Sequence, residues 1–298
     1  MGANPKLLEK IKTECDLVVA LGTRLDEITV QGYTLFDLPT PRQMLIHIHP
    51  SETDIGKVYA PTLGIVSDVN DAAAALAGAG FSIDGRGWDG WRGELRGLYE
   101  AFTSLDLNNR PRWNGADMNA IFAHLRDTLD EDSIVTSDAG NFSIWVRRHL
   151  RHGRPARMLA PISGAMGYGA PAAVAASLAH PDKQIIGFAG DGGFMMTGAH
   201  ALATAMQSGA KPVFIVCNNG LYGTIRMHQD RDFPNRPSGT SLMNPDFVKL
   251  AESFGAFGVK VDHADAFPSA LDAALKANRP ALIEIKMDAR QLTPSAMP

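Results

Sequence analysis

The sequence predicts an α/β protein: a doubly wound parallel sheet with helices on both faces, preceded by a smaller partial α/β unit. Two observations support this fold class. Short runs rich in Val, Ile and Phe alternate with helical segments through residues 113–298, and a shorter alternation of the same kind occupies the first 80 residues. Strands that are apolar along their whole length are typical of parallel sheets covered on both faces.

The first unit holds three apolar segments and one helix. The predicted elements are strands within 15–25, 43–50 and 60–68 and a helix over 69–80. The helix is expected to end at Gly80, because glycine is the usual residue just beyond a helix. These elements define a partial central domain over residues 1–82, followed by a connecting helix and linker over 83–112.

The larger unit, residues 113–298, alternates regularly between strands and helices. The predicted strands are 133–140, 184–190, 212–219, 258–261 and 280–287. The predicted helices are 115–129, 167–180, 198–209, 244–255 and 265–277. In the helix over 244–255, Asn244 is expected to be the N-cap, Pro245 the first helical residue and Gly255 the end.

The composition excludes several classes of protein. A formal net charge of −4 gives no reason to expect binding to nucleic acid or to an anionic membrane. The apolar runs stay below the roughly 20 residues that a membrane helix needs, and the N-terminal residues lack the apolar core of a signal peptide. Cys15 and Cys217 have no partner at metal-binding spacing and suit a reducing compartment. We therefore expect a cytoplasmic protein.

The strand over 184–190 ends in a glycine-rich stretch, GDGG, that contains one carboxylate, Asp191. A Rossmann dinucleotide loop is one interpretation, but that pattern requires a glycine where the chain has Met195. The GxxxxGK[ST] phosphate loop does not occur in the sequence either. A helix of about 18 Å and a returning strand of about 17 Å separate GDGG from Asn218 and Asn219. The two segments are therefore expected at the same edge of the sheet.

This edge of the sheet suits a divalent cation that holds a diphosphate, because it offers one carboxylate, one side-chain amide and the exposed backbone amides of glycines. Mg²⁺ prefers six oxygen ligands and usually keeps water and phosphate oxygens among them. We expect Asp191, the side-chain oxygen of Asn219 and the backbone carbonyl of Leu221 to bind the metal. The amides of Gly192 and Gly193, at a helix start, are expected to receive the remaining phosphate charge.

The combination of GDG, 25 intervening residues and NN resembles the motif of thiamine-diphosphate-dependent enzymes. Residues 112–288 resemble the cofactor-binding domain of the acetolactate synthase-like family, and the first 80 residues resemble the latter part of that family's central domain. The resemblance implies thiamine diphosphate and Mg²⁺ as cofactors of a lyase or transferase that acts on 2-keto acids. The implied reaction begins with a carbanion at C2 of the cofactor, which attacks the keto acid before decarboxylation.

The resemblance also assigns roles to three further segments: SDAGNF (137–142), SGAMGYG (163–169) and NNGLYG (218–223), the last of which completes the predicted metal loop. In SDAGNF, Gly140 and Asn141 are expected near the phosphates, and in SGAMGYG the carbonyl of Gly164 accepts a hydrogen bond from the cofactor's 4′-amino group. Met166 is implied as the catalytic side chain that wedges between the two cofactor rings and bends them into a V. The implied cofactor-binding residues are Gly140, Asn141, Gly164, Met166, Gly190, Asp191, Gly192, Gly193, Asn219, Leu221, Tyr222 and Gly223.

In this family, a glutamate from a separate pyrimidine-binding domain protonates the pyrimidine ring of the cofactor. None of the chain's glutamates stands in a motif that matches it. We therefore expect that a partner subunit supplies this residue, in a homo-oligomer or a hetero-oligomer, or that the reading frame is truncated. The remaining alternatives are a non-catalytic cofactor-binding or interaction chain and an NAD-dependent dehydrogenase.

The residues after the metal loop leave the identity of the 2-keto acid open. His228 stands where acetolactate synthases typically have a tryptophan, and Ile225 stands where simple pyruvate decarboxylases carry an acidic group. His228 and Gln229 are the candidate substrate contacts, in a segment, 227–243, that is expected to be either a mobile lid or an ordinary surface loop. The HIHP segment at 47–50 replaces a more acidic turn of the family, which makes FAD doubtful.

Other residues have structural interpretations that compete with functional ones. Considered without the NN segment, Asp191 would be interpreted as a turn residue whose side chain hydrogen-bonds its own backbone. Met195 and Met196 are expected in the core. His47 and His49 share one face of a strand, where polar surface or a remnant of a nucleotide loop is expected. A cluster of arginines is expected on a solvated or subunit-facing helix rather than at a nucleic acid. The cluster comprises Arg147, Arg148, Arg151, Arg154 and Arg157.

Overall fold

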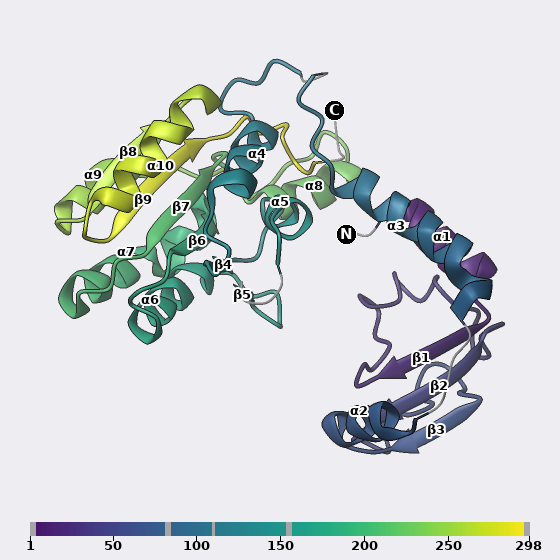
Figure 1. Cartoon of the computed structure of the whole chain (residues 1–298). Coiled ribbons are helices and arrows are strands. Elements are labelled where there is room, and N and C mark those ends of the chain that lie inside the picture. Colours follow the sequence, from purple (N-terminus) through teal and green to yellow (C-terminus); the bar gives the residue numbers. More distant parts are fainter. Residues whose placement is uncertain (1–3, 81–84, 109–110, 153–156, 295–298) are drawn as a thin grey trace. The chain divides into compact units, whose positions relative to one another are not determined.

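The computed structural model describes residues 4–80, 85–108, 111–152 and 157–294. The chain forms two compact units, Met1–Thr103 and Ser104–Pro298, which divide within the predicted linker. Figure 1 labels the elements of both units.

The first unit contains a three-stranded parallel sheet in the order β1-β2-β3. Its strands are β1 (Leu17–Leu21), β2 (Met44–His49) and β3 (Leu63–Val66). Its helices are α1 (Pro5–Glu14), α2 (Val69–Gly78) and α3 (Asp89–Thr103), the last preceded by a 3₁₀ turn over Gly85–Trp88. The sequence did not predict α1, in which Asn4 caps the first turn by accepting a hydrogen bond from the amide of Lys6.

The apolar core of this unit lies against one face of the small sheet. Ala20 and Leu45 lie in a core with Tyr59 and with apolar residues from the long connection between β1 and β2. On the opposite face Ile48 is buried, but most of the other apolar side chains are exposed, namely Leu17, Val19, Met44, Leu63 and Ile65. The unit is therefore a partial α/β layer, as predicted.

The second unit is built on six parallel strands in the order β5-β4-β6-β7-β9-β8. These strands are β4 (Ile134–Ser137), β5 (Arg157–Leu159), β6 (Ile185–Gly190), β7 (Val213–Asn218), β8 (Phe257–Val261) and β9 (Ala281–Lys286). The chain first moves from β4 to the edge strand β5 and then returns to the other side of β4. Ligands bind open α/β sheets at such a switch point, beyond the carboxyl ends of the strands.

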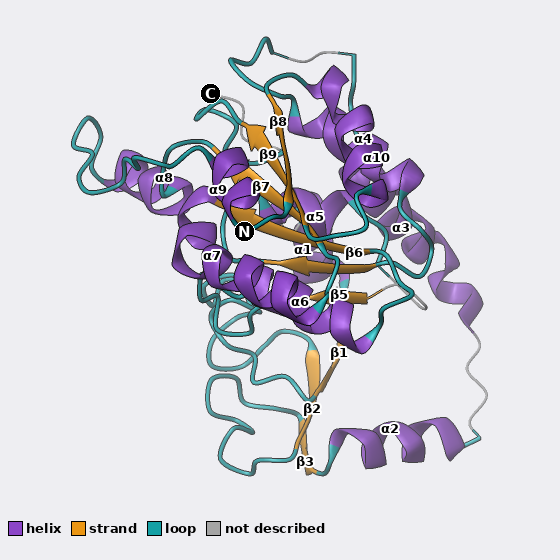
Figure 2. Cartoon of the chain, turned by 90° about the vertical axis from the view of Figure 1, so that its left-hand side faces the viewer, coloured by secondary structure: helices purple, strands orange, loops and turns teal. Residues whose placement is uncertain are grey.

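Helices cover both faces of this sheet, which confirms the predicted fold class (Figure 2). One face carries α4 (Met118–Thr128), α5 (Ser143–His149) and α10 (Phe267–Lys276). The other face carries α6 (Gly169–Ala179), α7 (Asp191–Ser208) and α9 (Phe247–Ser253). A further helix, α8 (Gly223–Asp232), follows β7. None of the described helices is long and apolar enough to cross a membrane.

Several element boundaries differ from those predicted. Helix α7 begins at Asp191 rather than at residue 198, because the glycine-rich stretch forms its first turns. Residues 227–232 belong to α8, so the expected loop over 227–243 is shorter than predicted. The N-cap prediction for Asn244 was wrong: Asp246 caps α9 by accepting from the amide of Lys249. The side chain of Asn244 is engaged elsewhere, as described below.

The start of α6 lies so close to the sheet that only glycine fits there. A Cβ atom on Gly169 would lie 2.5 Å from the carbonyl oxygen of Phe188 and 2.8 Å from the amide nitrogen of Asp138. Both neighbours are backbone atoms, so they cannot move aside without disturbing β4 and β6.

We expect Gly169→Ala to lower the free energy of unfolding by about 1–3 kcal/mol, the usual cost of overpacking. Urea unfolding followed by circular dichroism measures this. Thr204→Ala, at an exposed position of α7, is the control and should change stability by no more than about 0.5 kcal/mol. Equal stability of the two variants would show that the backbone at Gly169 has room to adjust.

Candidate functional site

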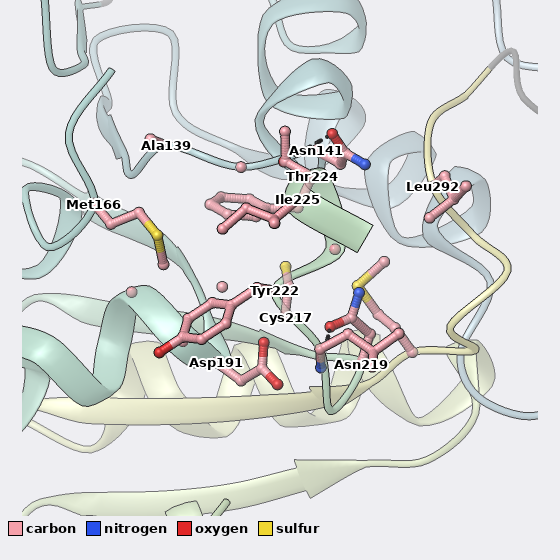
Figure 3. A pocket seen from close by; sticks show the side chains of 18 of the residues that line it. Ala139, Asn141, Met166, Asp191, Cys217, Asn219, Tyr222, Thr224, Ile225 and Leu292 are labelled. Carbon is pink, nitrogen blue, oxygen red and sulfur yellow. Dashed lines mark hydrogen bonds between the residues drawn. The ribbon is translucent and has the colours of Figure 1, made fainter. Parts of the chain in front are cut away.

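A cavity of about 310 Å³ lies at the carboxyl ends of the central strands of the second unit (Figure 3). It is bordered by the turn after β4, the 163–169 loop, the start of α7, the loop after β7 and the start of α8. The structure brings all twelve of the predicted cofactor-binding residues to this one cavity. They are Gly140, Asn141, Gly164, Met166, Gly190, Asp191, Gly192, Gly193, Asn219, Leu221, Tyr222 and Gly223.

Asp191 occupies the junction between β6 and α7. Gly190 ends the strand in an extended conformation, and Asp191 is the first helical residue, so no loop separates the two elements. Burial raises the pKa of the Asp191 carboxyl, whereas hydrogen bonds from the side chain of Asn244 and from backbone amides lower it. Its oxygen Oδ2 accepts from the amide of Gly220 at 2.9 Å and from Nδ2 of Asn244 at 2.7 Å.

The two adjacent asparagines after β7 have different environments. Asn219 lines the cavity, and its side-chain oxygen accepts from the amide of Leu221 at 3.1 Å. Asn218 instead donates from Nδ2 to Oε1 of the buried Glu284 on β9, at 2.8 Å. Of the pair, Asn219 is therefore the one that borders the cavity, and its role as a ligand stays a prediction.

The oxygen groups at this cavity fit Mg²⁺ better than a transition metal. Among the described residues, no group of three or more His, Cys, Asp or Glu side chains is placed to hold a metal ion. Asp191 is the one carboxylate among the described residues that line the cavity. A single carboxylate, an amide oxygen and a backbone carbonyl suit a hard cation that takes its remaining ligands from phosphate and water.

The start of α7 forms a cradle into which no side chain can be placed. A Cβ on Gly192 would lie 2.5 Å from Cε1 of Tyr222, and a Cβ on Gly193 would collide with Oδ2 of Asp138. The backbone amides of the first turn therefore approach the cavity closely. Backbone amides in the first turn of an 18-residue helix favour an anionic group such as a phosphate.

Asp138 is a buried residue of this site that the sequence analysis missed. Its carboxylate accepts hydrogen bonds from the amides of Gly167 at 2.9 Å, Tyr168 at 3.1 Å and Ala139 at 2.9 Å. It thus ties the end of β4 to the 163–169 loop, which presents Gly164 and Met166 to the cavity. Thr197 holds the same loop from α7, donating to the carbonyl of Gly167 at 2.8 Å. The sequence signal that could have identified Asp138 is an aspartate directly after an apolar strand.

The C-terminal segment supplies a second wall that the sequence did not predict. The cavity is also lined by Met287, Gln291 and Leu292, which lie more than 60 residues beyond the loop after β7. Gln291 is buried and anchors this segment, donating to the carbonyl of Ala116 at 2.8 Å and accepting from the amide of Met118 at 3.1 Å. Polar anchors of this kind leave no periodic pattern in the sequence.

The two candidate substrate contacts, His228 and Gln229, are not among the residues that line the cavity. Both belong to α8. Gln229 bridges to the loop that follows, donating to the carbonyl of Ser238 at 2.8 Å and accepting from its amide at 3.2 Å. A role of either residue in substrate binding stays a prediction.

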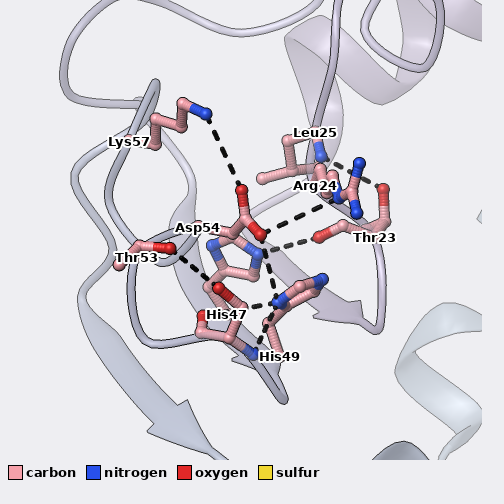
Figure 4. Close-up of polar contacts among 9 residues, drawn as sticks. Thr23, Arg24, Leu25, His47, His49, Thr53, Asp54 and Lys57 are labelled. Atoms are coloured by element: carbon pink, nitrogen blue, oxygen red, sulfur yellow. Dashed lines mark hydrogen bonds and ion pairs between the residues drawn. The ribbon is translucent and has the colours of Figure 1, made fainter.

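The histidine pair of the first unit, whose polar contacts are drawn in Figure 4, is buried, so the expectation of polar surface was wrong. Nε2 of His47 lies 2.9 Å from the carbonyl oxygen of Thr23, and Nδ1 of His49 accepts from the amide of Ser51 at 3.0 Å. Asp54 lies 3.9 Å from His49. The two rings thus fix the turns that follow β1 and β2.

The expected burial of two methionines was also wrong. Met195 and Met196 on α7 are 51% and 48% exposed. The arginine cluster is divided: Arg147 and Arg148 lie on α5, and Arg157 lies on β5. Arg154 lies outside the described residues.

Comparison with known proteins identifies two domains in the chain. Residues 138–285 match the family model "Thiamine pyrophosphate enzyme, C-terminal TPP binding domain", and residues 1–76 match "Thiamine pyrophosphate enzyme, central domain". The chain therefore belongs to the thiamine pyrophosphate enzymes, and most residues that line the cavity lie within the segment that matches the C-terminal TPP binding domain.

Within this family, the chain is similar to acetolactate synthases. It is 29% identical over 275 residues to the acetolactate synthase large subunit of Parasynechococcus marenigrum, covering 92% of this chain and 43% of that protein. It is 29% identical over 283 residues to the Escherichia coli acetolactate synthase isozyme 2 large subunit, covering 92% and 48%. The chain spans less than half the length of these relatives.

A solved structure has a similar fold. The thiamine diphosphate-dependent 4-hydroxybenzoylformate decarboxylase of Rhodococcus jostii RHA1 aligns with a TM-score of 0.72 at 25% identity, covering 96% of this chain and 51% of that one. This structural similarity is consistent with the α/β fold described above for both units.

We expect Asp138→Asn to lower the free energy of unfolding by about 2 kcal/mol, because a donor replaces an acceptor that faces backbone amides. Urea unfolding measures this loss. The control is Asp182→Asn, at an exposed position before β6, which should change stability by no more than about 0.5 kcal/mol. A variant at Asp138 that is as stable as the control would contradict the tie between β4 and the 163–169 loop.

Proposed function

We propose that this chain binds thiamine diphosphate together with Mg²⁺ and is the cofactor-binding part of an enzyme that acts on 2-keto acids. The observation that carries the proposal is the meeting of Asp191, the first-turn amides of α7 and the loop after β7 around one cavity. This arrangement provides one negative charge for a cation and several donors for a diphosphate. Membership of the thiamine pyrophosphate enzymes supports the same cofactor.

The proposed roles follow from the chemistry of each group. Asp191, the side-chain oxygen of Asn219 and the carbonyl of Leu221 would hold Mg²⁺. The amides of Gly192 and Gly193 would receive phosphate oxygens. Other lining residues assigned to the cofactor are Gly140, Asn141, Gly164, Met166, Gly190, Tyr222 and Gly223.

When bound, thiamine diphosphate supplies a nucleophilic carbon and an electron sink, which the side chains of a protein lack. The chain's own contribution is to bind the diphosphate, to orient the rings and to limit access of water. Met166 is suited to orienting the rings, because its side chain is apolar and flexible and points into the cavity (Figure 3).

The class of substrate is inferred from the relatives. The similar proteins are named acetolactate synthases and a 4-hydroxybenzoylformate decarboxylase, and the substrates of both classes are 2-keto acids. We propose 2-keto acid decarboxylation followed by carboligation or protonation for the protein to which this chain contributes. His228 and Gln229 remain candidates for contact with that substrate.

Turnover is proposed to need a pyrimidine-binding domain from a partner subunit. No glutamate is among the described residues that line the cavity, although this chemistry needs an acid at the pyrimidine ring. The exposed Met196 lies beside Gly167 of the 163–169 loop, so apolar surface adjoins the cavity. Such a surface suits contact with another copy of the chain or with a different subunit.

Asp191→Ala tests the metal assignment. We expect Mg²⁺-dependent binding of thiamine diphosphate to weaken by at least about tenfold, because the charged ligand is lost. Isothermal titration calorimetry measures the affinity, and circular dichroism checks that the fold is kept. Asp182→Ala is the control and should bind normally. Unchanged affinity in the Asp191 variant, or binding of NADH in preference to thiamine diphosphate with Mg²⁺, would count against the proposal.

The partner requirement is tested by turnover of a 2-keto acid such as pyruvate. We expect the purified chain to bind cofactor but to be slower by a factor of at least about 100 than the chain supplied with a pyrimidine-domain protein, because the ring acid is missing. Consumption of pyruvate measures both rates. Full activity of the chain alone would contradict the requirement, and binding without turnover under either condition would favour a non-catalytic chain.

A further inference from the structure

The segment that follows α8 returns to the loop after β7 and pairs with it. The amide of Tyr222 donates to the carbonyl of Thr240 at 2.9 Å, and the amide of Leu242 donates to the carbonyl of Gly220 at 2.8 Å. An antiparallel bridge joins Leu221 to Ser241. This short ladder fixes the position of the backbone just before Asn244.

Asn244 stands at the end of the ladder and uses both hydrogens of its side-chain amide. Nδ2 donates to Oδ2 of Asp191 at 2.7 Å and to Oδ1 of Asn218 at 2.9 Å. Asn218 is itself fixed, because its own Nδ2 donates to Oε1 of Glu284 at 2.8 Å. Asn244 thus links the start of α7 to the end of β7, and through it to β9.

The contacts of Asn244 are not explained by a role in helix α9. Asp246 provides the side-chain cap of that helix, and Asn244 lies before it. An asparagine amide also differs from a lysine or histidine donor, because it keeps its donor at every pH and adds no positive charge beside a cation site. These properties suit a group that orients a carboxylate without competing with a metal ion.

We propose that Asn244 is a positioning residue that fixes the carboxylate of Asp191 for binding a divalent cation. The inference rests on the proposed function, in which Asp191 is a metal ligand. Two donors, Asn244 and the amide of Gly220, hold the same oxygen, so the carboxylate cannot rotate freely about its last bond. Residues that orient a metal ligand in this way typically change metal affinity by about 10–100-fold when they are replaced.

The test measures Mn²⁺ affinity of the full chain by electron paramagnetic resonance, with thiamine diphosphate present at a saturating concentration. We expect Asn244→Ala to weaken Mn²⁺ binding by about tenfold. The matched control is Met243→Ala, because this neighbouring side chain is fully exposed. The control should bind Mn²⁺ like the unchanged chain. An affinity of Asn244→Ala equal to that of the control overturns the inference.

A double-mutant cycle separates positioning from a general structural effect. If Asn244 acts through Asp191, then adding Asn244→Ala to Asp191→Asn should cause almost no further loss of Mn²⁺ affinity, because the two effects are not additive. A full additional loss would show that Asn244 acts by another route and would overturn the inference. If Asp191→Asn alone leaves the affinity unchanged, the proposed metal site itself is wrong.

Discussion

The candidate site depends on the direct passage from β6 into α7. Strand β6 ends at Gly190 and α7 begins at the next residue, Asp191. The backbone of Asp191 is therefore fixed by a buried strand on one side and by a helix of 18 residues on the other. The same junction places the first-turn amides of α7 at the cavity. Close packing of Gly192 against Tyr222 and of Gly193 against Asp138 then brings the neighbouring loops to it. A side chain at either glycine would separate these loops from α7.

Two buried carboxylates, Asp138 and Asp191, lie near this junction and make different contacts. Asp138 accepts hydrogen bonds from backbone amides of two segments, so its carboxylate holds the 163–169 loop. Asp191 also accepts hydrogen bonds, yet its burial still raises the pKa of its carboxyl. A nearby cation would stabilise the charged form of Asp191. We therefore assign Asp138 to holding the fold and propose Asp191 for the metal.

The sequence predicted the fold class and most of the cavity because both depend on local patterns. Apolar strands and glycine-rich turns are visible in the sequence, and parallel pairing brings their ends to one edge. What it could not predict depends on contacts between distant residues. Asn244 has the pattern of an N-cap, but its side chain lies 53 positions from its partner Asp191. Met195 and Met196 look like core residues, and only the packing of α7 shows that they are exposed.

The described cavity is lined entirely by residues of the second unit, from Ala139 to Leu292. The proposed binding of a cation and a diphosphate would therefore need only residues of that unit. Protonation of a pyrimidine ring is a different requirement, because it needs an acid at the far end of the cofactor, and no glutamate is among the described lining residues. In the proposed function, binding and turnover are therefore separate requirements: α7 and the loop after β7 would hold the cofactor, and a partner would supply the acid.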